Sequence, residues 1–259
     1  MGRYIDMKRI LFFTFICFCF YTRGQETKTI HVFVALCDNV NQGIVPVSRT
    51  LGNGQNPKTN LYWGALYGVK THFKRSEDWE FVDTPKTTDP KILDRALFKH
   101  KHSDTYLLAD AYDGRYIKEA TIDFLQAAGG READKVNYNG TDLSVGGDAE
   151  LVAYIGHDGL MEFSLDQDFN SDSSKEKDAI ILACISKDYF SPYLKQTGAT
   201  PLVWTTGLMA PEAYTLKWAI DGWIKGESND EIRERAAQAY NHYQKCGMRG
   251  ARNLLVTGY

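Results

Sequence analysis

The sequence predicts an α/β fold, in which a mostly parallel sheet of roughly six strands lies between helices as a three-layer αβα sandwich. Two observations predict it. Short apolar runs alternate along the chain with longer amphipathic segments, which is the pattern of strands joined by covering helices. Two of these runs, residues 151–155 and 179–183, are hydrophobic at every position, as in strands buried on both faces.

The remaining elements follow from the same alternation. We expect strands at residues 30–36, 79–82, 105–109, 151–155, 179–183 and 201–205, and helices at 60–75, 90–100, 116–128, 187–197, 211–225 and 229–245. The last helix has the clearest start, because Ser228 and Glu231 have the spacing of a capping box. Residues 38–59, with three Gly and two Pro, form a long loop after the first strand, where a sheet usually carries function.

The composition is that of a globular protein, with 43% hydrophobic and 24% charged residues and a formal net charge of −3. These values exclude a disordered chain, a collagen-like chain and a protein with many membrane spans. The chain has no excess of Lys and Arg that could neutralise phosphates, so we expect no nucleic-acid partner.

The N-terminal segment has the layout of a secretory signal peptide. Lys8 and Arg9 precede an apolar run, residues 10–21, and the small residue Gly24 follows. The run is too short for a stable membrane span, which needs roughly 20 residues. We therefore expect residues 1–24 to be removed, residues 25–259 to form a single domain, and the mature protein to be secreted or periplasmic.

The number of cysteines in the mature protein depends on that cleavage. Cys17 and Cys19 leave with the signal peptide, so Cys37, Cys184 and Cys246 remain. An odd number in an exported protein means that at least one thiol is free or paired between chains. Cys246 follows the last predicted helix and is either free or paired with Cys37.

One reactive side chain follows each of the two continuous apolar strands. His157 comes after residues 151–155 and Gly156, and Cys184 comes directly after residues 179–183. Ligands of open α/β sheets bind at the carboxyl ends of the strands, so neighbouring strands would place His157 and Cys184 side by side. A Cys beside a His can be activated as a nucleophile.

These strand ends resemble a known family. An apolar strand followed by Gly-His-x-Gly, and about 27 residues later a second apolar strand ending in Ala-Cys, is similar to the caspase-like clan of cysteine peptidases, which includes caspases, legumains, gingipains and separases. The resemblance in layout covers most of residues 30–225. It implies a caspase-like fold and a thioester acyl-enzyme, with His157 as general base or acid and Cys184 as nucleophile. It also implies an oxyanion hole formed by the amide of Cys184 with that of Gly159 or Asp158, and no cofactor.

The sequence therefore predicts a secreted or periplasmic cysteine endopeptidase that acts on a peptide or protein substrate. We expect the substrate to be bound by Asp38, Asn39, Asp158 and Thr206. Because two of these residues are acidic, a basic side chain would be preferred. Two other functions remain open: a catalytically inactive caspase-like domain that binds a protein or peptide, and an unrelated α/β hydrolase or nucleotide-binding enzyme whose site lies in residues 38–59.

Two patterns could hold a metal ion, and neither matches a known site in full. Oxygen ligands alternate as at the start of a calcium loop at Asp166, Asp168, Asn170 and Asp172. Ser171 takes the place of the usual turn Gly and Lys177 that of the bidentate Glu, which favours a solvated acidic loop. His100 and His102 offer two ligands without a nearby Cys or carboxylate motif. We therefore expect no metal.

Overall fold

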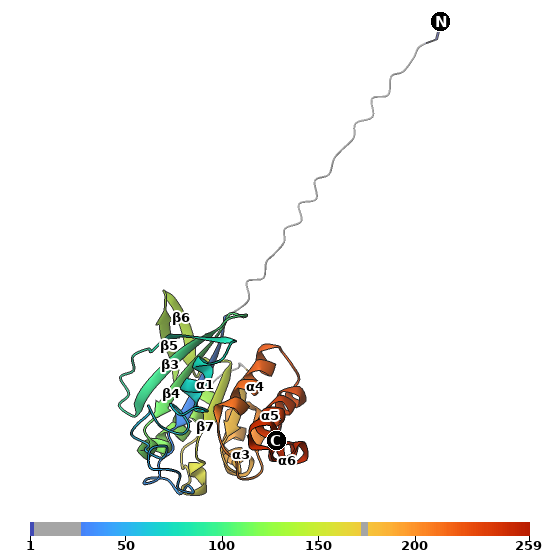
Figure 1. Cartoon of the computed structure of the whole chain (residues 1–259). Coiled ribbons are helices and arrows are strands. Elements are labelled where there is room, and N and C mark those ends of the chain that lie inside the picture. Colours follow the sequence, from blue (N-terminus) through green and yellow to red (C-terminus); the bar gives the residue numbers. More distant parts are fainter. Residues whose placement is uncertain (3–26, 172–175) are drawn as a thin grey trace.

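The computed structural model describes residues 1–2, 27–171 and 176–259 (Figure 1). Nearly all of the expected signal peptide, residues 1–24, lies outside the described residues, as does Asp172. Among the described residues, no helix is both long enough and apolar enough to cross a membrane.

A large, mostly parallel sheet organises the described chain. It has eight strands rather than the six expected, in the order β10–β9–β8–β7–β1–β4–β3–β2. Its strands are β1 (Lys28–Ala35), β2 (Trp79–Asp83), β3 (Ile92–His100), β4 (Thr105–Tyr112), β7 (Leu151–Ile155), β8 (Asp178–Leu182), β9 (Thr200–Thr205) and β10 (Leu255–Val256). From β9 through β8, β7 and β1 to β4 the strands are parallel, whereas β2, β3 and β10 pair antiparallel.

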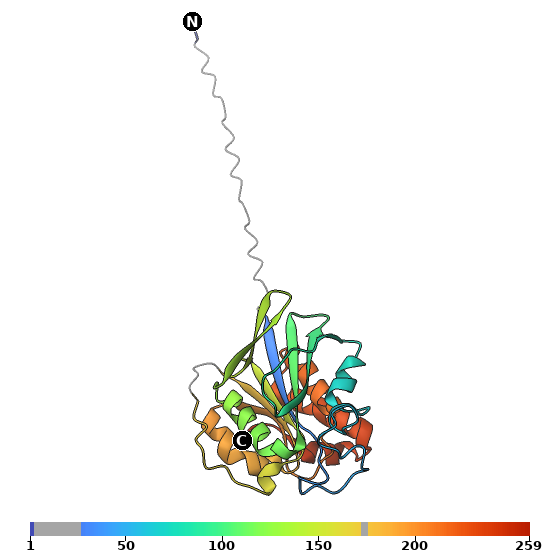
Figure 2. The same cartoon turned by 90° about the vertical axis from the view of Figure 1, so that its left-hand side faces the viewer.

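Helices cover both faces of the sheet. They are α1 (Val69–Lys74), α2 (Ile117–Ala128), α3 (Ser186–Thr197), α4 (Ala213–Ile224), α5 (Asn229–Gln244) and α6 (Met248–Leu254), with two short 3₁₀ turns, η1 (Gly114–Tyr116) and η2 (Gly159–Met161). The apolar sides of α1, α4 and α5 pack on one face with Val32 and Val34, and those of α2 and α3 pack on the other with Phe33 and Ala35 (Figure 2). Successive residues at the end of β1 thus enter opposite cores, which is why residues 32–35 are all apolar.

The expected helix at residues 90–100 is wrong, because this segment forms β3. Ala96 and Phe98 point into the same core as α1, whereas Leu97 packs against a separate ribbon made of β5 (Ala133–Tyr138) and β6 (Thr141–Gly146). With both faces covered, the two-residue period of a strand is hidden in the sequence. The ribbon itself, α6 and β10 were also not expected.

The expected helix at residues 60–75 is reduced to α1 by a turn built on Asn60. This side chain is fully buried, accepts hydrogen bonds from the N–H groups of Cys37 and Tyr62, and donates to the carbonyl of Cys37. Gly68 permits the close return of the chain, since a Cβ there would lie 2.5 Å from the backbone of Trp63. Asn60 thereby ties the long loop to the carboxyl end of β1.

A buried charged cluster joins β1, β3 and β4. The Asp110 carboxylate accepts hydrogen bonds from Arg95 Nε at 2.6 Å and from His31 Nε2 at 3.0 Å. His31 Nδ1 accepts from the N–H of Gly146 at 3.0 Å, so the imidazole also fastens the β5–β6 ribbon to the sheet. Every partner of the buried carboxylate is a donor, as a buried charge requires.

Replacing Asn60 with Ala should lower the free energy of unfolding by about 2–4 kcal/mol, because it leaves the N–H and carbonyl of Cys37 buried without partners. The measurement is urea unfolding followed by tryptophan fluorescence. Asn53→Ala is the matched control, because Asn53 is exposed in the same loop and its loss should change stability by less than about 0.5 kcal/mol. Equal losses in the two variants would contradict the anchoring role of Asn60.

Candidate active site

The adjacent strands β7 and β8 bring His157 and Cys184 to the same edge of the sheet. They pair in parallel with Ile155 opposite Leu182, and the N–H of Gly156 donates to the carbonyl of Leu182 at 3.2 Å. His157 and Cys184 each stand two residues beyond that last pair. The two strands are held at this level by apolar side chains buried on both faces.

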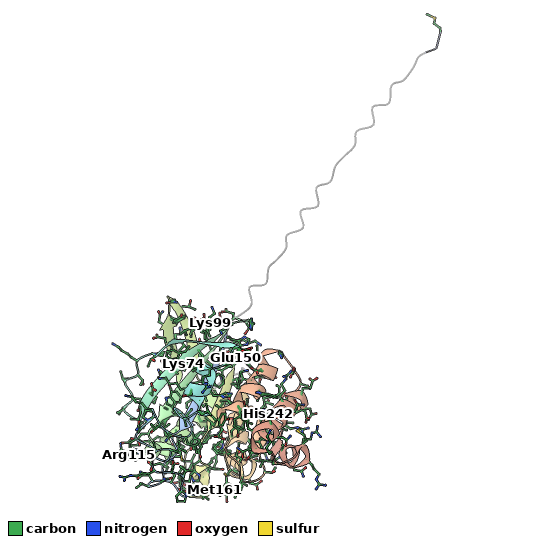
Figure 3. All side chains as sticks on the ribbon, viewed as in Figure 1. Lys74, Lys99, Arg115, Glu150, Met161 and His242 are labelled. Carbon is green, nitrogen blue, oxygen red and sulfur yellow. The ribbon has the colours of Figure 1, made fainter. Side chains whose placement is uncertain are left out.

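Both side chains line one cavity of about 390 Å³ at the carboxyl edge. Its wall comes from the loops that follow β1, β7, β8 and β9 and consists of Gly43, Ile44, Val45, Val47, Leu61, Tyr62, Gly156, His157, Met161, Cys184, Leu208, Met209, Ala210, Pro211 and Glu212. Figure 3 shows Met161 at the opposite end of the molecule from Glu150, the residue that precedes β7. The cavity therefore lies where ligands of open α/β sheets bind.

His157 is held by a carboxylate that sequence reasoning missed. Its Nε2 lies 2.5 Å from Glu162 Oε1, and the same oxygen accepts the N–H of Gly43 at 2.6 Å. Because a carboxylate only accepts hydrogen bonds, Nε2 is the donor in this pair. The carbonyl of His157 accepts the hydroxyl of Tyr154 at 2.8 Å, which holds the main chain as well.

The Cys184 thiol is partly buried beside the loop that follows β9. Its Sγ accepts the N–H of Met209 at 3.4 Å and lies 3.6 Å from the Met209 carbonyl. Burial raises the pKa of Cys184, and the nearby Asp158 carboxylate raises it further, although the Met209 hydrogen bond opposes the shift. The resting thiol is therefore neutral at neutral pH, and a base has to remove its proton when it attacks.

A strained turn follows the thiol. Ile185 adopts φ 50° and ψ 31°, in the left-handed region that a β-branched residue rarely enters. Its N–H donates to the carbonyl of Gly207 at 2.9 Å, and α3 begins at the next residue, Ser186. The turn joins the Cys184 loop to the loop after β9.

The amides predicted for an oxyanion hole are unoccupied by other groups. Among residues 27–171 and 176–259, the N–H groups of Cys184, Asp158 and Gly159 have no acceptor. Gly159 is the first residue of η2, and a Cβ there would lie 2.6 Å from the ring of Phe163. The close packing fixes the main chain that carries these amides.

Asp158 is fully buried next to the site, but its side chain does not form part of the cavity wall. Its Oδ1 accepts the N–H of Leu160 at 3.0 Å, whereas Oδ2 has no partner among the described residues. Burial, aided by the charge of Glu162, raises the pKa of Asp158 to about 7. A carboxyl group that is half neutral near pH 7 is a poor receptor for a basic substrate side chain.

The other predicted substrate-binding residues also lie outside the cavity wall. Asp38 is buried, and its carboxylate accepts hydrogen bonds from Asn41 and Gln55 that hold its pKa below the usual value against the effect of burial. Asn39 bonds both main-chain groups of Val47. Asp38 and Asn39 thus shape the long loop rather than the wall, which instead includes Val47.

Thr206 is exposed, and its hydroxyl donates to the carbonyl of Asn253 at 2.7 Å. It therefore anchors the end of α6 to β9. The nearby wall residues are Leu208 and Met209, a few positions further along the chain.

Apolar wall residues were missed although the sequence carries a signal for them. Ile44, Val45 and Val47 are apolar residues in a Gly- and Pro-containing loop, and loops without a binding role are usually polar. Glu162 gives no comparable signal, since it reaches His157 only because η2 folds the chain back.

Neither metal pattern forms a complete site within the described residues, where no group of three or more His, Cys, Asp or Glu side chains could hold a metal ion. The Asp168 carboxylate binds the amide of Asn170 instead, and the rings of His100 and His102 pack 5.8 Å apart. The three described cysteines are free, so Cys246 does not pair with Cys37 in this structure.

A larger cavity of about 620 Å³ lies elsewhere, between α1 and α4, and no cysteine is among the residues that line it. Its Lys217 is paired with Asp78 and Asp221, each at 2.7 Å. Burial lowers the pKa of its His72 to about 4, so that imidazole is neutral. The cavity beside Cys184 is therefore the candidate active site.

Asp158→Asn should remove part of the pH dependence of stability. The pKa of Asp158 is raised in the folded protein. The stability that this group contributes is therefore complete below its ordinary pKa of 3.8 and is lost as pH rises through about 7. Between about pH 4 and about pH 8, the free energy of unfolding of the wild type should fall by on the order of 3 kcal/mol more than that of the variant. Urea unfolding at a series of pH values measures this difference.

Asp166→Asn is the control for this experiment, because Asp166 is exposed in the same inter-strand segment. It should keep the pH dependence of the wild type. Parallel curves for the wild type and Asp158→Asn would show that Asp158 does not titrate in this range.

Comparisons with known proteins find no matching family model, no matching curated protein and no matching solved structure. The resemblance of the two strand ends to caspase-like peptidases therefore remains a prediction. The chemistry of the site has to be inferred from its own residues.

Proposed function

We propose that this protein is an exported cysteine endopeptidase of the caspase-like type, with Cys184 as nucleophile and His157 as general base and acid. The observation that carries the proposal is that both side chains line one cavity at the carboxyl ends of two neighbouring parallel strands. Adjacent His and Cys strands in a sheet covered by helices on both faces are also what a caspase-like fold requires. Export rests on the layout of residues 1–24 alone.

The neutral thiol determines how the reaction would start. As Cys184 Sγ attacks the carbonyl carbon of the scissile peptide bond, His157 Nδ1 takes the thiol proton, and an S–C bond forms. The imidazolium then gives that proton to the leaving nitrogen, the C–N bond breaks and the amine departs. The thioester remains on the enzyme.

Water completes the cycle. His157 accepts a proton from a water molecule while the water oxygen attacks the thioester carbon. His157 then returns the proton to the departing sulfur. The acid product leaves, and the neutral thiol is restored. Because every proton passes through one imidazole, the orientation of His157 governs both halves of the reaction.

Glu162 would orient the imidazole and stabilise its charged form. Its oxygen at 2.5 Å from Nε2 keeps the proton on that nitrogen, which leaves Nδ1 free to act as base. The Gly43 N–H holds the same oxygen, so the long loop sets the position of the carboxylate. Glu162 is thus a positioning residue.

The oxyanion of each tetrahedral intermediate would be held by main-chain amides. One of these N–H groups belongs to Cys184, the nucleophilic residue itself. The other, of Gly159 or Asp158, lies on the loop that carries His157. Their lack of other acceptors within the described chain supports this role.

The raised pKa of Cys184 favours one second candidate, a binding module that holds a peptide in the same cavity without cleaving it. The two functions share a ligand and differ in turnover. The Cys184 variant below separates them.

Cys184→Ala should abolish hydrolysis of a fluorogenic peptide library, because no other described thiol lines the cavity. Cys246→Ala is the matched control: this thiol is exposed beyond α5, and its removal should leave the rate unchanged. Activity that survives in Cys184→Ala would exclude the proposed mechanism, and a wild type that binds peptides without turnover would establish the binding module.

Glu162→Gln should lower kcat at least about tenfold with little change in KM, because the amide no longer stabilises the imidazolium. The acidic limb of the kcat profile against pH should also shift, which a purely structural loss would not produce. Glu77→Gln, a substitution at an exposed residue that lines the other cavity, should behave as the wild type. An unaltered kcat and pH profile in Glu162→Gln would rule out this positioning role.

A further inference from the structure

Most of the wall of the cavity beside Cys184 consists of apolar residues, which do not suit the binding of a charged side chain. Val45 is 86% exposed, Leu208 70% and Met161 38%, and they come from three different loops. Large apolar side chains held in water at the mouth of one cavity commonly mark a binding surface. Ile44 and Pro211 continue the apolar surface inside.

The wall contains one carboxylate, that of Glu212, and this group has no cationic partner among the described residues. Glu212 accepts the hydroxyl of Tyr214 at 2.9 Å and the side-chain amide of Gln244 at 3.3 Å, and burial raises its pKa. Asp38 and Asp158 are buried away from the wall. The wall therefore offers a substrate Arg or Lys a single carboxylate, and burial disfavours the charged form of that group.

We infer that this cavity binds a large apolar side chain, such as Leu, Met or Phe, on the residue that supplies the scissile carbonyl. This inference rests on the proposed peptidase function and names its substrate class. Cys184 and His157 are themselves part of the wall, so the side chain that fills the cavity belongs to the residue whose carbonyl carbon meets Sγ. A volume of about 390 Å³ accommodates such a side chain.

The first test uses fluorogenic peptides that are identical except for that residue, which is Leu, Met, Phe, Arg, Lys or Asp. The wild type should cleave the Leu peptide with a kcat/KM about 10- to 100-fold above that of the Arg peptide. Cleavage that depends on Cys184 but favours Arg, Lys or Asp would overturn the inference and leave the peptidase function standing.

A designed change of preference keeps the test independent of folding defects. Leu208→Glu places a carboxylate at the mouth of the cavity, and it should lower kcat/KM for the Leu peptide while raising it for the Arg peptide. Leu66→Glu is the matched control, because Leu66 is 50% exposed and lies outside this cavity. Far-UV circular dichroism checks that the variant is folded. An equal effect on both peptides in a folded variant would overturn the assignment of Leu208 to the substrate wall.

Binding to Cys184→Ala distinguishes the failure of this inference from that of the proposed function. Dye-labelled peptides ending in Leu or Arg are titrated and followed by fluorescence anisotropy. Preferential binding of the Leu peptide, without any turnover by the wild type, would support the apolar cavity and overturn the peptidase function. Equal binding, preferential binding of the Arg peptide, or no binding of either peptide would overturn the inference.

Discussion

In-register pairing of β7 with β8 is the constraint on which the candidate site depends. Both strands are buried on both faces, so a slip of one residue would turn every side chain toward the wrong core. The register that satisfies the two cores also ends the strands at the same level, with Ile155 opposite Leu182. The burial of apolar surface that stabilises the sheet therefore also places His157 beside the loop of Cys184.

The loops above this edge are joined to one another as well as to the strands. Glu162 Oε1 binds both His157 and Gly43, so the loop after β7 is linked to the loop after β1. On the other side, Cys184 Sγ meets the main chain of Met209, which belongs to the loop after β9. His157 and Cys184 are therefore held by chain segments far apart in sequence, and a defect in one loop should disturb the others.

The parts of this arrangement that the sequence predicts are those that depend on uniform burial. Residues 151–155 and 179–183 are apolar throughout, and a reactive side chain, His157 or Cys184, follows each run within two residues. The same approach predicts a helix where β3 forms, because burial on both faces hides the two-residue period of this strand. The sequence also does not predict the direction in which a side chain points. Asp38 follows β1 at the expected edge, yet its carboxylate accepts hydrogen bonds from Asn41 and Gln55. Glu162 could not be found at all, since its contact with His157 requires the turn of η2.

The left-handed turn at Ile185 has a consequence for the behaviour of the protein on warming. A β-branched residue in this conformation costs on the order of 1–3 kcal/mol, which the hydrogen bond to the Gly207 carbonyl and the start of α3 have to offset. Because the cost is concentrated beside the thiol, this turn is expected to relax at a lower temperature than the strands below it. Heat should then loosen the Cys184 loop while the circular dichroism of the protein still reports an intact sheet.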